Sequence, residues 1–108
     1  MTAVGSNTIT LRGTSGSSYT FSIYPLGQAF KALGGVYAIL RFEGGSYQVL
    51  YVGQTGDLSE RFDDHHKAAC FSRNGATHIA VLVEPSESRR LMIEKDLTAM
   101  YSPICNGR

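Results

Sequence analysis

Residues 35–53 read GVYAILRFEGGSYQVLYVG, two apolar segments on either side of a short turn. Residues 36–42 and 47–52 are rich in β-branched and aromatic side chains, which favour extended strands. Between them, the adjacent glycines Gly44 and Gly45 supply the positive φ angles that a tight hairpin needs. This stretch therefore predicts an antiparallel β-hairpin around which the remaining elements are arranged.

Three further segments predict additional strands. Residues 8–12 and 19–23 alternate in polarity on either side of a Gly/Ser-rich turn, which is typical of a second hairpin. Residues 77–83 are almost continuously apolar, and this pattern predicts a strand in the middle of a sheet. The strands together indicate a small antiparallel or mixed β-sheet.

Helices are expected to flank this sheet. Residues 86–101 have apolar side chains at helical spacing, with Leu91, Leu97, Met100 and Tyr101 on the repeating positions. One or two helical turns are expected within residues 28–33. A longer helix is expected to begin at Asp57, with Glu60 completing a capping box, and to continue toward Phe71, whereas residues 104–108 read as an extended tail. The predicted class is α/β, in the α+β arrangement.

Length and charge limit what the chain can be. It has 108 residues and a formal net charge of +1, from ten Lys and Arg against nine Asp and Glu. We expect a single domain over residues 1–108, because a chain of this size forms one core. The near-neutral charge disfavours a strongly cationic protein that coats duplex DNA. Without a long apolar run or a secretory signal, we expect no membrane association, a cytoplasmic location, and reduced Cys70 and Cys105.

Four side chains are expected to meet at one end of the central hairpin. Tyr37 and Tyr51 are symmetric about Gly44, so strand pairing should set them nearly opposite each other on one face. Arg61 and His65 are four residues apart and share one face of the expected helix. A guanidinium and an imidazole above two phenols suit a bound phosphate. Each of the four residues, taken singly, is also typical of a structural or solvated surface position.

These residues carry a family resemblance. GVY at 35–37, followed after thirteen residues by YVG at 51–53, resembles the paired signature of the GIY-YIG nuclease superfamily, with Val in place of Ile in both halves. The resemblance covers residues 34–106, so that residues 7–24 would be an added N-terminal β-hairpin. The remaining signature positions match, in order, Arg61, His65, Glu94 and, after Pro103, Asn106.

The resemblance implies an endonuclease that uses a metal ion to hydrolyse phosphodiester bonds in nucleic acid, DNA above all. Glu94 would be the protein ligand of one Mg²⁺ or Mn²⁺, since hard cations take oxygen ligands and keep several waters. Tyr37 would be the general base on the attacking water, and Arg61 would stabilise the charge of the pentavalent phosphorane. A free phenol has a pKa of about 10, so a nearby cation must lower the pKa of Tyr37 for this role.

The other residues of the signature would support that chemistry. Tyr51 would orient water or phosphate, His65 would relay a proton or contact the phosphate, and Asn106 would hold the active-site loop or the substrate. A local basic rim is expected to include Arg89, Arg90 and Lys95. Nucleic-acid contacts are expected at Arg41, Lys67, Arg73, Gly53 and Gln54.

The sequence leaves a second class of function open. A catalytically inactive nucleic-acid-binding or interaction module that retains the fold would share most of these residues. Small size and low charge favour single-stranded or branched DNA over long duplex, as in DNA repair or recombination. A homodimer or a targeting partner protein would supply any further specificity.

Overall fold

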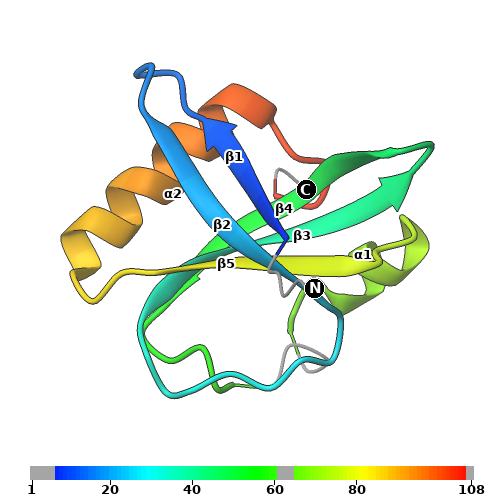
Figure 1. Cartoon of the computed structure of the whole chain (residues 1–108), viewed down its shortest axis with the longest axis horizontal. Coiled ribbons are helices and arrows are strands. Elements are labelled where there is room, and N and C mark those ends of the chain that lie inside the picture. The colour runs from blue at the N-terminus through cyan, green and yellow to red at the C-terminus, as the bar shows by residue number, and fades with distance from the viewer. Residues whose placement is uncertain (1–6, 61–64, 107–108) are drawn as a thin grey trace.

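The computed structural model describes residues 7–60 and 65–106. Within this part of the chain, five strands form one antiparallel sheet, and two helices pack against it (Figure 1). The elements, in chain order, are β1 (Thr8–Arg12), β2 (Ser18–Pro25), β3 (Gly35–Glu43), β4 (Ser46–Thr55), α1 (Ala68–Arg73), β5 (His78–Val83) and α2 (Glu87–Tyr101).

The strand order is β1-β2-β5-β3-β4, so the most apolar strand lies in the middle of the sheet. The prediction that residues 77–83 form a central strand is therefore confirmed. β2 pairs with β1 on one side and with β5 on the other, which makes the N-terminal strands part of the same sheet as the central hairpin. β4 is the edge strand next to β3.

The hairpin of β3 and β4 turns at Gly44 and Gly45, whose φ angles are +63° and +84°. The expected role of the two glycines in this turn is confirmed, since L side chains rarely adopt such angles. The pairing register shifts between Ile39 and Leu40, where one extra residue of β4 is accommodated. Such a bulge changes which side chains face each other along the rest of the hairpin.

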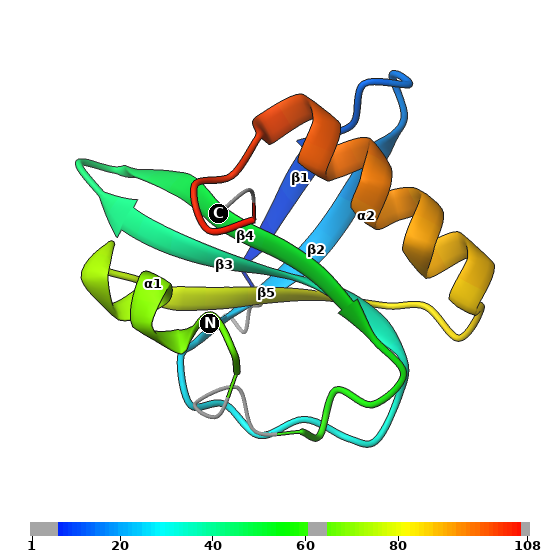
Figure 2. The ribbon, with the colours of Figure 1, turned by 180° about the vertical axis from the view of Figure 1, so that it is seen from behind.

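Side chains alternate between two hydrophobic clusters on opposite faces of the sheet. One cluster includes Ile93 and Leu97 of α2, and we call its side the α2 face (Figure 2). The other includes Phe71 of α1 and is called the α1 face. The α2-face cluster consists of Leu11, Phe21, Ile23, Val36, Ala38, Leu40, Val52, Ala80, Ile93 and Leu97; the α1-face cluster consists of Tyr37, Ile39, Leu50, Tyr51, Leu58, Phe71, Ile79, Val81 and Cys105.

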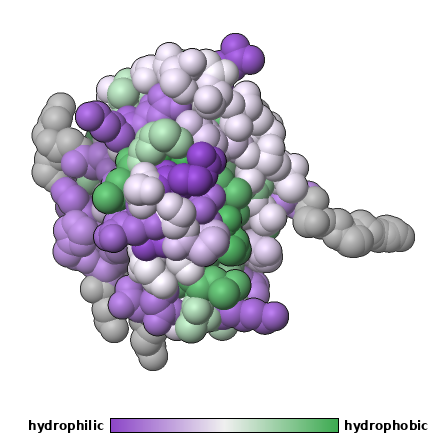
Figure 3. All heavy atoms as spheres, turned by 90° about the vertical axis from the view of Figure 1, so that its left-hand side faces the viewer, coloured by the Kyte–Doolittle hydropathy of each residue, from purple (hydrophilic) through white to green (hydrophobic). Residues whose placement is uncertain are grey.

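α2 begins and ends where the sequence predicts. The Ser86 side chain accepts a hydrogen bond from the backbone N–H of Arg89, as an N-cap residue does. After Tyr101, Ser102 adopts a left-handed conformation with φ of +42°. Of the apolar side chains expected to pack from this helix, Leu97 is buried, but Leu91, Met100 and Tyr101 are exposed. Hydrophobic and hydrophilic side chains are accordingly mixed on the side of the molecule where α2 begins (Figure 3).

The other two helix predictions are wrong in whole or in part. Residues 28–33 contain no helix, because a segment of six residues between Gly27 and Gly34 is too short to be stable as a helix alone. The expected helix from Asp57 appears among the described residues only as a turn at 58–60 and as α1. The Asp57 carboxylate does accept from Ser59 N–H, but Asp57 N–H bonds Thr55 Oγ1, so the capping box does not form.

The C-terminal tail also differs from the expectation. Residues 104–106 form a turn instead of an extended segment, with Asn106 N–H donating to the Pro103 carbonyl at 3.0 Å. Cys105 in this turn is disulfide-bonded to Cys70 of α1. The expectation that both thiols are reduced is therefore wrong, because folding brings two cysteines 35 positions apart in the sequence into direct contact.

A carboxylate on α2 ties the turn between β1 and β2 to the rest of the fold. Asp96 is only 9% exposed and accepts hydrogen bonds from Thr14 Oγ1, from Ser15 N–H and Oγ–H, and from the Tyr19 hydroxyl. These bonds hold the pKa of Asp96 below its usual range. Neither α1 nor α2 is long and apolar enough to cross a membrane.

Candidate active site

Two tyrosines lie side by side on the α1 face. The bulge in the hairpin places Tyr37 opposite Gly53 and Tyr51 opposite Ile39, so the two tyrosines are diagonal neighbours. Their ring centroids are 6.0 Å apart. The prediction that they lie nearly opposite each other on one face holds for the shared face, but the register offsets the two tyrosines by two residues. The prediction assumed that the hairpin turn is centred on Gly44. The turn is instead centred between Gly44 and Gly45, and β4 contains the bulge.

Gly53 provides the space in which the two phenols approach each other. A Cβ atom at this position would lie 2.7 Å from Tyr37 Oη and 2.8 Å from Tyr51 Cε2. Those separations are shorter than van der Waals contact, so any larger residue would displace at least one ring. Gly53 was expected to contact nucleic acid, and its evident role in the structure is to allow the tyrosine pair to form.

His65 completes the cluster. Its Nε2 lies 2.7 Å from Tyr37 Oη, and its ring centroid is 5.0 Å from that of Tyr51. Its other ring nitrogen, Nδ1, accepts a hydrogen bond from the backbone N–H of Lys67 at 3.0 Å. Because Nδ1 is an acceptor, the neutral ring carries its proton on Nε2 and donates it to Tyr37. The imidazole therefore offers the phenol oxygen a donor.

The environment of His65 favours the neutral ring. Its pKa is lowered from 6.5 by burial first, and then by the charges of His66 and Lys67. His66 stacks on His65 with a centroid separation of 4.4 Å. Adjacent side chains on a helix point about 100° apart, but these two residues precede α1 and can therefore stack.

Burial makes the phenols weaker acids. It raises the pKa of Tyr37 far above 10, and the neighbouring Tyr51 and the negative charge of Glu94 raise it further. The pKa of Tyr51 is raised by burial and by Glu94, whereas the hydrogen bond with Tyr37 lowers it. Positive charge near Glu94 would oppose the contribution of that carboxylate to the pKa of both phenols.

Glu94 is the carboxylate whose negative charge raises the pKa of both phenols. It lies half-buried on α2, the helix that contacts edge strand β4 most extensively, and its charge affects both phenols. Burial raises the pKa of Glu94, and in the described part of the chain no hydrogen bond or ion pair to its carboxylate offsets that rise.

The single carboxylate of Glu94 suits one kind of metal ion. Residues 7–60 and 65–106 contain no group of three or more His, Cys, Asp and Glu side chains that could hold an ion. A single desolvated carboxylate suits Mg²⁺ or Mn²⁺, which retain several water ligands, and does not suit structural zinc, which needs four ligands. Glu94 is the residue that would hold such an ion.

Asn106 fastens the strand that carries Tyr51. Its Oδ1 accepts from the backbone N–H of Val52, and its Nδ2 donates to the Val52 carbonyl, both at 2.8 Å. One residue earlier, Cys105 N–H donates to the Leu50 carbonyl. The tail therefore pairs with the outer edge of β4 on both sides of Tyr51.

Gln54 and Arg90 form a second support beside the site. Arg90 is 7% exposed, and its Nε donates to Gln54 Oε1 at 2.9 Å. Its Nη1 donates to the carbonyls of Glu84 and Pro85. The expectation that Arg90 belongs to an exposed basic rim is therefore wrong, since its charge is used to join the ends of β4 and β5. Gln54, expected to contact nucleic acid, has its side-chain oxygen occupied by Arg90.

Of the remaining predicted contacts, Lys67 adjoins the tyrosine cluster through its backbone N–H, and the others lie elsewhere or outside the described residues. Arg41 lies toward the hairpin turn, where it bonds Gln48 and pairs with Glu43 at 3.2 Å. Lys67 precedes α1, and Arg73 is its exposed last residue. Arg61 is outside the described residues.

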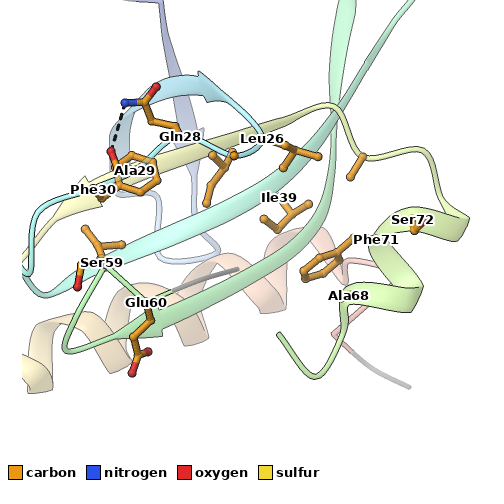
Figure 4. A pocket seen from close by; sticks show the side chains of 14 residues that line it. Leu26, Gln28, Ala29, Phe30, Ile39, Ser59, Glu60, Ala68, Phe71 and Ser72 are labelled. Atoms are coloured by element: carbon orange, nitrogen blue, oxygen red, sulfur yellow. Dashed lines mark hydrogen bonds between the residues drawn. The ribbon is translucent and has the colours of Figure 1, made fainter. Parts of the chain in front are cut away.

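An apolar hollow of about 690 Å³ adjoins the cluster (Figure 4). Its inner side is formed by Ile39, Ile79 and Phe71, and Phe30 stands across from them. The Phe71 ring lies 5.3 Å from that of Tyr51, so one aromatic side chain borders both the hollow and the tyrosine cluster. Glu60 also lines this hollow.

Sequence reasoning missed several groups that shape the site. Phe71 reads as an ordinary core residue, and the backbone N–H of Lys67 that orients His65 has no sequence signature. The contact of Cys105 with Cys70 has no signature either, since spacing in the chain does not report proximity in the fold.

Comparisons of the chain with protein-family models, with curated proteins and with solved structures find no significant match. The function is therefore argued from the residues and their geometry.

Proposed function

We propose that this protein is a metal-dependent endonuclease of the GIY-YIG type that hydrolyses phosphodiester bonds in DNA, with residues 34–106 as its catalytic core and residues 7–24 as an added hairpin. The observation that carries the proposal is the cluster of Tyr37, Tyr51 and His65, together with the half-buried carboxylate of Glu94, whose charge raises the pKa of both phenols. Phenol, imidazole and carboxylate groups so arranged would provide a base, a proton donor and a metal ligand.

Tyr37 is the proposed general base. Tyr37 first loses its phenol proton to solvent, and the resulting phenolate accepts a hydrogen bond from His65 Nε2–H and takes a proton from the attacking water. A donor on the charged form lowers the pKa of the phenol, which opposes the effect of burial. Tyr51 orients water or phosphate beside Tyr37.

Positive charge is supplied by two groups. Glu94 would hold a divalent ion, which when bound would supply positive charge to the scissile phosphate and to the leaving 3′ oxygen. Arg61 stabilises the phosphorane with a planar set of donors, a geometry that Lys lacks. Asn106 and Gly53 keep Tyr51 in position, the first by hydrogen bonding and the second by its lack of a side chain.

The proposed substrate is single-stranded or branched DNA in preference to long duplex. A net charge of +1 supplies few phosphate contacts, and phosphate contacts dominate affinity for long duplexes. Lys67 and Arg73, at the two ends of α1, are the proposed DNA contacts nearest to the site, and Arg41 is a more distant one.

One observation favours a second candidate function. The strongly raised pKa of Tyr37 is what a catalytically inactive nucleic-acid-binding module would retain, since such a module needs no phenolate. The two candidates differ in whether DNA is cleaved when a divalent ion is present.

The test is cleavage of a labelled DNA panel that contains a single strand, a blunt duplex, a flap and a four-way junction, with Mg²⁺ or Mn²⁺. Glu94→Gln keeps the size of the side chain but removes the metal ligand, and should lower the cleavage rate at least about a hundredfold. Glu87→Gln, an exposed carboxylate on the same helix, is the matched control and should cleave like the wild type.

Binding of the panel without metal-dependent cleavage would refute the nuclease and support the binding module. Equal cleavage of the blunt duplex and of its separate strands would contradict the proposed preference for unpaired DNA.

A further inference from the structure

The Cys70–Cys105 disulfide joins two segments that both lead into the candidate active site. Cys70 belongs to α1, and Cys105 belongs to the turn that follows α2. Cys105 is fully buried in the same hydrophobic cluster as Tyr37 and Tyr51. The bond therefore lies on the α1 face, beneath the site, and not at a remote surface.

On the α1 side, the residue after Cys70 contacts the site directly. The Phe71 ring lies 5.3 Å from the ring of Tyr51 and 5.2 Å from the ring of His65. α1 has only six residues, too few to be stable as an isolated helix. Its position depends on packing and on the covalent bond to the tail.

On the other side, the bond holds the tail that fastens β4. Cys105 N–H donates to the Leu50 carbonyl, and the Asn106 amide makes two hydrogen bonds to Val52. Tyr51 stands between these two anchored residues. One covalent bond thus fixes both the backbone of Tyr51 and the helix whose phenylalanine packs on Tyr51 and His65.

The two sulfur atoms differ in accessibility. Cys70 is partly exposed, whereas Cys105 is closed to solvent. An external thiolate can reach Cys70 Sγ, and Cys105 would then be the leaving group. The Asn74 amide nitrogen lies 3.5 Å from Cys70 Sγ and 3.9 Å from Cys105 Sγ, where it can donate to a newly formed thiolate.

We propose that the Cys70–Cys105 pair is a redox modification site that controls the candidate active site, and that its co-reactant is a dithiol reductant. This inference rests on the proposed function for its effect on cleavage. A thiolate of the reductant attacks Cys70 Sγ, the disulfide breaks, and Cys105 leaves as a thiolate. The second thiol of the reductant then attacks its own sulfur in the mixed disulfide and releases Cys70. Two electrons and two protons pass to the protein, and the reductant becomes a disulfide.

Reduction uncouples α1 from the tail. Phe71 and His65 are then no longer held against Tyr51 by a covalent tether, and the bonds from Asn106 to Val52 open more often. Displacement of a catalytic group by about 1 Å can cost about a hundredfold in rate. We expect the reduced protein to cleave DNA about a hundredfold more slowly and to recover when it is reoxidised.

The experiment compares the oxidised protein, the protein reduced with dithiothreitol, and the Cys70→Ser/Cys105→Ser double variant. Amide hydrogen exchange is followed at Val52 beside the site and at Ile23 on the α2 face, together with the NMR signals of the His65 ring and the Mg²⁺-dependent cleavage rate. On reduction, exchange at Val52 should accelerate at least about tenfold and the His65 signals should shift, while Ile23 stays protected. The double variant should resemble the reduced protein and should not respond to dithiothreitol.

Three possible results decide between redox control of the site, a crosslink of the whole fold and a protein without nuclease activity. Unchanged exchange at Val52, unchanged His65 signals and an unchanged cleavage rate after reduction would overturn the proposal. Loss of protection throughout, Ile23 included, would also overturn it, because the disulfide would then be a crosslink of the whole fold. A protein that cleaves in neither state, yet responds at Val52 and His65, would refute the nuclease and support redox control of the site's structure.

Discussion

The face of the sheet under α2 is packed with buried aliphatic side chains and Phe21, whereas the face under α1 carries two phenols, an imidazole and a disulfide. On the α2 face, the buried charges of Arg90 and Asp96 have their hydrogen bonds completed by carbonyl, amide and hydroxyl groups. On the α1 face, Tyr37 and His65 have pKa values displaced mainly by burial. Stability is thus expected to depend mainly on the α2 face, whereas reactivity is expected to depend on the tyrosine cluster of the α1 face together with Glu94 of α2.

The largest expected effect is on stability and comes from the α2 face. Phe21 is fully buried there, and Phe21→Ala leaves a cavity that should cost about 3–5 kcal/mol of unfolding free energy. The melting temperature should fall by about 4–8 °C for each kcal/mol. Thermal unfolding followed by circular dichroism measures the loss, and cleavage per folded molecule should stay at the wild-type level. A specific loss of cleavage at equal folded concentration would break the division between the faces.

The next largest effect is expected on the α1 face and on activity. In Gly53→Ala, the new methyl group overlaps Tyr37 Oη and Tyr51 Cε2, so at least one phenol must move. Cleavage should fall about a hundredfold, while overpacking costs about 1–3 kcal/mol of stability. The cleavage rate and the unfolding free energy are measured for both variants. The loss of cleavage relative to the loss of stability should be much larger for Gly53→Ala than for Phe21→Ala. Wild-type cleavage by Gly53→Ala would show that the tyrosine pair has no catalytic role.

A smaller, pH-dependent effect is expected from Asp96. Its pKa is depressed in the folded state by bonds from Ser15 and Tyr19 first, and then from Thr14. A group with a depressed pKa contributes stability above its unfolded pKa and loses that contribution as the pH falls toward the folded pKa. Wild-type unfolding free energy should therefore decrease below about pH 4, and that of Asp96→Asn should be lower at pH 7 and flatter below pH 4. Urea titrations across this range provide the measurement, and parallel curves would contradict the prediction.

His65 should give a related but weaker pH dependence on the α1 face. Its folded pKa lies below 6.5 because of burial, so the unfolded chain takes up the proton first as the pH falls. The contribution of the neutral ring to stability is present above pH 6.5 and declines below it. An NMR titration should place the midpoint of His65 below 6.5, and His65→Gln should remove that part of the pH dependence. A midpoint above 6.5 would contradict the burial argument.

The smallest effect is expected at the exposed end of α1. Arg73→Gln should weaken binding of single-stranded DNA severalfold and reduce the slope of log affinity against log salt by about 0.7, as expected for one lost phosphate contact. Fluorescence anisotropy at several salt concentrations measures both values. Thermal stability should not change. A steep wild-type slope, indicating many phosphate contacts, would contradict the small contact area that the net charge suggests.

Local sequence patterns predicted the elements that depend on neighbours in the chain. β5, the glycine turn of the hairpin and the helix α2 were all anticipated, since each reflects the local conformational preferences of a few adjacent residues. The helix expected from Asp57 was not recovered as predicted in the described residues. Asp57, the expected N-cap residue, lies in a turn instead. Its backbone N–H, which Glu60 would bond in a capping box, donates to Thr55 Oγ1.

For the candidate site, the sequence supplied the members but not their arrangement. Tyr37, Tyr51 and His65 were selected from the sequence, and the structure brings these three together. A one-residue bulge in β4 made the tyrosines diagonal, and a backbone N–H fixed the proton of His65. Neither feature can be inferred from residue types, because both depend on atomic distances between segments.

By itself, the sequence determined the α+β class, the central strand, the hairpin turn and the residue types available for chemistry. Only the tertiary structure decided that Cys70 and Cys105 are bonded, that Arg90 is buried, and which groups raise or lower each pKa. The physical reason is the separation along the chain over which each effect acts. Conformational preference acts between neighbours in the chain, whereas register, burial and electrostatic coupling depend on contacts between residues far apart in sequence.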